Sequence, residues 1–63
     1  MKNLNIELNQ EIEHAKKVKE ANNMTFATIW LTGKKSFGFN FDPKPIGYTV
    51  YEFGIKRKVV AVV

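Results

Sequence analysis

The chain has 63 residues, no cysteine, one histidine and a formal net charge of +4 at pH 7. This length predicts a single domain over residues 1–63, and a domain of this size buries only about 60% of its unfolded surface. The absence of cysteine excludes disulfides and thiolate zinc sites, so we expect a homodimer to supply the missing buried area. The positive charge favours an anionic partner, or it serves solubility alone.

The sequence predicts neither a membrane span nor an export signal. No apolar run approaches the roughly 20 residues of a membrane span, and the beginning MKNLNIELNQ lacks the apolar stretch of a signal peptide. A soluble, cytoplasmic protein without a membrane partner is therefore expected.

Residues 4–23 are predicted to form an amphipathic helix. Its apolar residues fall within roughly 120° of arc at about 100° per residue: Leu4, Leu8, Ile12, Ala15 and Val18. Acidic residues come early and lysines late, which suits the helix dipole. Asn22 and Asn23 can adopt the left-handed conformation that ends helices. Residues 4–8 also alternate like a short strand, so a helix that begins only at Asn9 is the alternative.

Residues 24–32 and 36–42 are predicted to form a β-hairpin around a Gly33-Lys34 turn. Glycine at the first central position suits a two-residue type II′ turn. Side chains alternate along strands, so this register gathers the aromatic residues on one face: Phe26, Trp30, Phe37, Phe39 and Phe41. We expect this face to be core, opposite the helix; a binding surface is the alternative.

Part of the hairpin resembles the first RNA-binding strand signature of cold-shock domains. The likeness rests on Trp30 followed by Lys35-Ser36-Phe37-Gly38-Phe39, and it departs at Asn40, where the family has an aliphatic residue. The resemblance implies that Trp30, Phe37 and Phe39 stack bases while Lys35 meets phosphate. The second, His-containing signature of that family is absent.

The remaining chain is predicted to add two strands. Residues 43–47 (PKPIG) read as a loop, residues 48–53 as a strand, and residues 58–63 as a final strand after a turn from Gly54. The expected fold class is α+β, with order α-β-β-β-β, as an antiparallel four-stranded meander covered by the helix on one face. A small SH3-like or OB-like barrel is the alternative.

The final run is apolar at every position: Val59, Val60, Ala61, Val62 and Val63. Such a run is typical of a strand buried on both faces. At the end of a meander it would instead be an exposed apolar edge, which proteins avoid. We therefore predict that these residues form a homodimer interface across a two-fold axis and complete the sheet there.

The basic residues gather near two turns. In a meander, the turns after Gly33 and Gly54 lie at the same end of the sheet. This predicts a positive pole that contacts a partner or an anion: Lys34, Lys35, Lys56, Arg57 and Lys58.

Signals for catalysis are missing. His14 lies at the margin of the helix stripe, no serine has a plausible triad partner nearby in sequence, and no glycine-rich phosphate loop occurs. We expect no enzyme activity, no metal and no cofactor. The leading interpretation is a non-catalytic interaction protein, similar in size and style to phage or mobile-element factors that bind and inhibit a host protein. The alternatives are a single-stranded RNA- or DNA-binding protein, and a binder of small nucleotide-like anions at a dimer seam.

Overall fold

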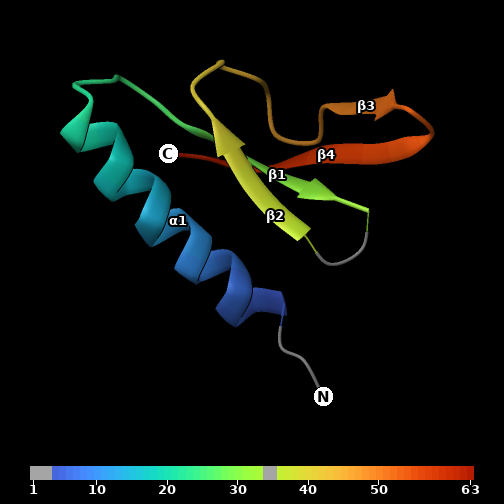
Figure 1. Ribbon diagram of the computed structural model, residues 1–63, viewed down its shortest axis with the longest axis horizontal. Coiled ribbons are helices and arrows are strands. Elements are labelled where there is room, and N and C mark those ends of the chain that lie inside the picture. Colours follow the sequence, from blue (N-terminus) through green and yellow to red (C-terminus); the bar gives the residue numbers. More distant parts are fainter. Residues whose placement is uncertain (1–3, 34–35) are drawn as a thin grey trace.

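The computed structural model describes residues 4–33 and 36–63 (Figure 1). It contains the helix α1 (Leu4–Ala21) and the strands β1 (Thr28–Thr32), β2 (Ser36–Asn40), β3 (Thr49–Glu52) and β4 (Ile55–Val62). All strand pairs are antiparallel, and α1 packs against β1 and β2. The predicted α+β class and the α-β-β-β-β order are therefore confirmed.

Helix α1 begins at Leu4, so residues 4–8 are helical and not a strand. It ends at Ala21, and Asn23 has a φ of 57°, which confirms the predicted left-handed termination. The Met24 N–H donates to the Lys19 carbonyl at 2.9 Å, so a carbonyl of the last turn is satisfied by the chain as it leaves the helix.

The strand order is β2-β1-β4-β3, so the predicted meander is wrong. The reason lies in residues 41–48, which join β2 to β3. With Pro43 and Pro45 this segment is too long and too extended for a tight hairpin. It can instead reach about 26 Å, enough to pass the roughly 14 Å across two intervening strands. β2 and β3 form the two edges of the described sheet, which is open and not the alternative barrel.

The connecting segment crosses on the sheet face opposite to α1. The fully buried Thr28 anchors it, because its hydroxyl donates to the Asp42 carbonyl and accepts from the Lys44 N–H at 3.4 Å. Further on, the Gly47 N–H donates to the Val59 carbonyl at 2.9 Å. We call this side of the sheet the loop face, and the side against α1 the helix face.

The β1–β2 register differs by one residue from the predicted one. Leu31 lies opposite Phe37 and Ile29 opposite Phe39, because three residues, 33–35, separate the paired Thr32 and Ser36. A one-residue shift moves side chains to the other face of a sheet. The aromatic residues are therefore divided: those of β2 lie on the helix face and Trp30 lies on the loop face.

The core lies between α1 and the helix face. Ala15, Ala27 and Ile29 are fully buried, and they are surrounded by Leu8, Ile12, Phe37, Phe39, Phe41, Val60, Ala61 and Val63. This confirms that the helix packs through Leu8, Ile12 and Ala15.

A bulge explains why the end of β4 is apolar at every position. The register with β1 shifts between Ile29 and Trp30, so Val60 has no opposite residue. Val59 consequently shares the loop face with Trp30, while Val60 and Ala61 both pack against the helix-face core. Both faces of this strand are thus used within a single chain.

Candidate partner-binding surface

The β3–β4 hairpin turns over only two residues, Phe53 and Gly54. Both have positive φ, 54° and 76°, the pattern of a type I′ turn, which matches the twist of the flanking strands. β4 accordingly begins at Ile55, earlier than the predicted strand from residue 58. The lysines expected in a turn therefore belong to a strand, where alternation divides them between the two faces.

The end of this hairpin exposes large apolar side chains. Phe53 is 97% exposed, Tyr51 73% and Ile55 50%. We call these three residues the hairpin tip. Tyr51 lies opposite Lys56 on the helix face and Ile55 opposite Glu52 on the loop face, so exposed apolar side chains stand on both sides of the turn at Phe53. Exposed apolar surface gathered at one place is a recurrent mark of an interaction site, whereas isolated exposed hydrophobic residues need no explanation.

Two lysines share the helix face with Tyr51. Lys56 lies directly opposite Tyr51, and Lys58 lies opposite Thr49 on β3 and opposite Leu31 on β1. Since α1 packs over β1 and β2, this part of the helix face is uncovered, and both lysines are exposed. The Tyr51 ring therefore lies beside the positive charges of Lys56 and Lys58.

On the loop face of the hairpin, the charges of Arg57 and Glu52 neutralise each other. Arg57 Nη1 donates to Glu52 Oε2 at 2.6 Å, and the guanidinium carbon lies 5.6 Å from the centroid of the Trp30 ring. A cavity of about 310 Å³ adjoins this pair and is lined by Thr32, Glu52, Phe53, Ile55 and Arg57. Arg57 therefore stabilises the hairpin and contributes little free charge to a partner.

The predicted positive pole is partly realised. The Gly33 N–H donates to the Lys56 carbonyl at 2.7 Å, so the two turns do lie at the same end of the sheet. Lys56 and Lys58 point to the helix face, whereas Arg57 points to the loop face. The predicted members Lys34 and Lys35 lie outside the described residues.

The predicted stacking set does not come together. Trp30 is only 5% exposed, on the loop face, where its ring meets Tyr48 edge to face at 6.1 Å. Phe37 and Phe39 pack into the core on the opposite face. One base-stacking platform cannot include all three, because a sheet separates them.

The predicted interface run is not part of an outermost strand. Residues 59–62 belong to β4, which lies between β1 and β3, but β3 pairs only with residues 55–58, so the side of residues 60–62 that faces away from β1 is not paired with β3. Val59 is fully buried, and Val62 is 37% exposed. Val60, Ala61 and Val63 pack against the core beneath α1, so part of this run is buried without a second copy. A homodimer stays a prediction, which sedimentation at micromolar concentration would test.

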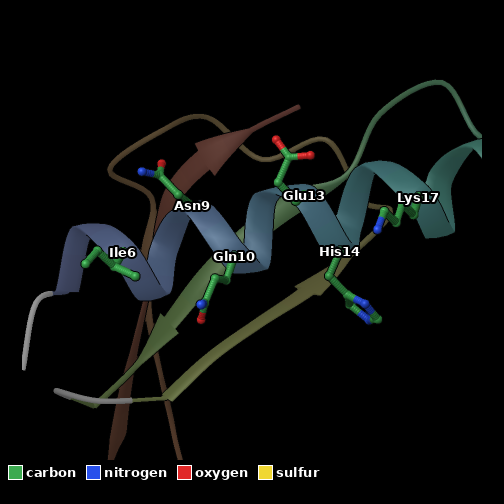
Figure 2. Close-up of a pocket in the computed structure, with 6 residues that line it drawn as sticks. All are labelled: Ile6, Asn9, Gln10, Glu13, His14 and Lys17. Carbon is green, nitrogen blue, oxygen red and sulfur yellow. The ribbon is translucent and has the colours of Figure 1, made fainter.

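A second cavity, of about 420 Å³, lies on the outer side of α1. It is lined by Ile6, Asn9, Gln10, Glu13, His14 and Lys17. Figure 2 shows Asn9 and Glu13 projecting toward the top of the view and Gln10 and His14 toward the bottom, so these groups do not converge on one point. The His14 ring instead meets Phe39 edge to face at 5.4 Å, which places it at the margin of the core.

Residues 4–33 and 36–63 form neither a metal site nor a membrane-spanning helix. This part of the chain holds no group of three or more His, Asp or Glu residues placed to bind a metal ion. No helix within it is long and apolar enough to cross a membrane. Comparison with protein-family models, curated proteins and solved structures gave no match.

The hairpin tip was missed by sequence reasoning, although a signal for it exists. A residue followed by Gly54, between the strand-like runs 48–52 and 55–60, is the pattern of a two-residue hairpin. Assigning that turn would have placed Phe53 at its outer corner and extended the last strand back to Ile55.

Proposed function

We propose that this chain is a non-catalytic protein that binds a partner protein through the hairpin tip. The observation that carries the proposal is Phe53, a large apolar side chain that is 97% exposed on a backbone with a φ of 54°.

Folding gains little from a phenylalanine at this position. The left-handed region costs an L-residue about 1–2 kcal/mol, and the residues preferred there in a type I′ turn are Asn, Asp and Gly. Phe53 also gains almost no burial to offset that cost. A residue that is unfavourable for folding but exposed at a protruding turn suggests selection for contact. Burying its ring against a partner would contribute about 1.5–3 kcal/mol.

The surroundings of Phe53 define the kind of partner. Ile55 extends the apolar contact on the loop face, and Tyr51 extends it on the helix face, where Lys56 and Lys58 also lie. Interfaces commonly bury an apolar centre inside a charged rim, and opposite charge on the partner accelerates association. The complementary surface is an apolar pocket with acidic groups beside it. Inhibition of a host protein would follow if that pocket serves the host protein's own function.

Cross-linking with a matched substitution tests the proposal. A photo-reactive phenylalanine derivative at Ile55 should give a discrete protein adduct in cells, and Phe53→Asn should abolish that adduct. The same derivative at Ile6, which is 55% exposed on α1, outside the hairpin tip, should give none. Phe53→Asn should also raise the free energy of unfolding by about 1 kcal/mol, because Asn tolerates positive φ. An adduct that persists in Phe53→Asn would contradict the proposal.

A second candidate is supported by Tyr51. Its exposed ring lies opposite Lys56 and near Lys58, an arrangement that could stack a base and contact phosphates. This surface would replace the separated set of Trp30, Phe37 and Phe39. Tyr51→Ala should then weaken oligonucleotide binding by about 1–3 kcal/mol, and Lys56→Ala should reduce the salt dependence of binding.

A further inference from the structure

One edge of the sheet is unprotected. The strand order leaves β2 and β3 outermost, and α1 runs beside β2 (Figure 1). Proteins usually block an exposed edge with lysine, proline, a bulge or a covering element. The sequence of β3, Thr-Val-Tyr-Glu, contains neither lysine nor proline, and it pairs with β4 without a register shift. Its only charge, Glu52, is paired with Arg57 at 2.6 Å.

The hydrogen bonds show which backbone groups of β3 point outward. The Val59 N–H donates to Tyr48 on the β3 side, whereas the Lys56 carbonyl accepts from Gly33 on the β1 side. Alternate residues of a strand bond in the same direction, so Ile55 and Arg57 also face β3. Their partners Glu52 and Val50 are bonded to β4. The backbone groups of Thr49 and Tyr51, opposite Lys58 and Lys56, therefore point away from the sheet.

We propose that β3 accepts an extended segment of the partner protein as a fifth strand, with acidic side chains at alternate positions. This rests on the proposed function, since the added strand would lie beside the hairpin tip and belong to the same interface. Main-chain bonds to Thr49 and Tyr51 would provide affinity, and the alternating side chains would provide selectivity.

Charge determines which segment fits. An added strand would lie two strand spacings from β4, about 10 Å, a gap that extended lysine and glutamate side chains bridge together. On the helix face the available charges are Lys56 and Lys58. On the loop face the added strand would meet the half-buried Val50 and the neutralised Glu52. Acidic residues toward the helix face and apolar residues toward the loop face are the complementary pattern.

The probe is a short, end-blocked peptide of alternating Glu and Val, compared with one of alternating Lys and Val. The acidic peptide should bind, and added salt should weaken its binding; the basic peptide should not bind. In amide hydrogen exchange, the peptide should newly protect the N–H groups of Thr49 and Tyr51, while those of Val50 and Glu52 are protected from the start. Protection confined to other elements would overturn the proposal.

Proline substitutions in β3 distinguish N–H groups that point outward from N–H groups that bond to β4. Thr49→Pro removes an outward N–H and should weaken acidic-peptide binding about tenfold or more, leaving the hairpin folded. Thr49→Val is the matched control, because it also removes the hydroxyl bond to the Gly47 carbonyl but keeps the N–H. Val50→Pro, which removes an inward N–H, should unfold the hairpin. If Thr49→Pro also unfolds the hairpin, the test is the wild-type exchange experiment, in which the acidic peptide should newly protect the N–H groups of Thr49 and Tyr51.

The outcomes distinguish the two proposals. Failure of the acidic peptide to bind, or equal binding by Thr49→Pro and Thr49→Val, overturns the edge proposal and leaves the role of Phe53 intact. If the peptide binds at the β3 edge but cells give no Phe53-dependent adduct, the edge proposal is supported and the proposed role of the hairpin tip is contradicted. A short oligothymidylate that binds where the acidic peptide does not would overturn the edge proposal in favour of the nucleic-acid candidate.

Discussion

The guanidinium carbon of Arg57 lies 5.6 Å from the centroid of the Trp30 ring, and this contact joins the protruding hairpin to the centre of the sheet. Arg57 also bonds Glu52 across the hairpin, and it borders the cavity behind Phe53. The same side chain thus covers the indole and supports the tip. Both contacts are lost together when the arginine is shortened.

Arg57→Ala should lower the free energy of unfolding by about 1–2 kcal/mol, the combined range of one cation–π contact and one exposed ion pair. In the wild type, Trp30 is 5% exposed, so its fluorescence should be blue-shifted and shielded from acrylamide. The variant should be quenched more readily. Lys58→Ala on the opposite face is the control and should change neither property; equal quenching of both variants would exclude the stacking role.

Thr28→Val should release the segment that crosses the loop face. The hydroxyl of Thr28 is fully buried and bonds both the Asp42 carbonyl and the Lys44 N–H. Valine fills the same space but leaves these groups without their partner, at a cost of about 1–3 kcal/mol. Faster amide exchange at Lys44, measured by NMR, should accompany the loss. The exposed Thr25→Val is the control, and unchanged exchange at Lys44 would contradict the anchoring role.

Ile29→Ala should be severely destabilising, by about 2–5 kcal/mol, because this side chain is fully buried between α1 and the sheet. The chain offers an identical substitution on the surface: Ile46 is 70% exposed, and Ile46→Ala should change stability by less than about 0.5 kcal/mol. Urea unfolding of both variants measures the difference. Similar midpoints would show that the helix does not cover this face.

Phe39→Ala should cost about 3 kcal/mol, since its ring packs edge to face on both Phe41 and His14 within the core. His14→Ala should cost less than about 1.5 kcal/mol, the value of one aromatic pair, and should leave partner binding intact. Thermal unfolding and the Ile55 cross-link provide the two measurements. Loss of the adduct in a folded His14→Ala protein would give the histidine a functional role.

Several elements could be predicted from the sequence because they depend on near neighbours. The helix stripe of Leu8, Ile12 and Ala15 follows from the period of the α-helix, and the left-handed Asn23 from the preference of asparagine for that conformation. Composition predicts the approximate position of each strand, and the two prolines in residues 43–47 predict a loop. Each of these features needs only a few consecutive residues to form.

Predicting the hairpin tip from the sequence required the correct position of the turn at Phe53 and Gly54. A bulky Phe53 ahead of Gly54 is a weak signal, since type I′ turns favour small polar residues at that position. The sequence therefore predicts a turn that begins at Gly54 and runs to Lys58, which does not place Phe53 at an exposed corner. Likewise, one additional residue in the loop 33–35 moved Trp30 to the opposite face from Phe37, because side chains alternate with a period of two.

By itself, the sequence determined that a strand ends the chain with apolar side chains on both faces, because no polar residue interrupts residues 59–63. It could not determine what buries them. The same apolar run could be buried by a second copy of the chain or by other parts of the same chain. Only the tertiary structure decides, by packing Val60, Ala61 and Val63 against the core beneath α1. It also carries residues 41–48 across the loop face, which brings β3 beside residues 55–58 of β4 and leaves β3 as an outer edge. Edge and interior strands differ in their neighbours, and neighbours distant in sequence leave no local signal.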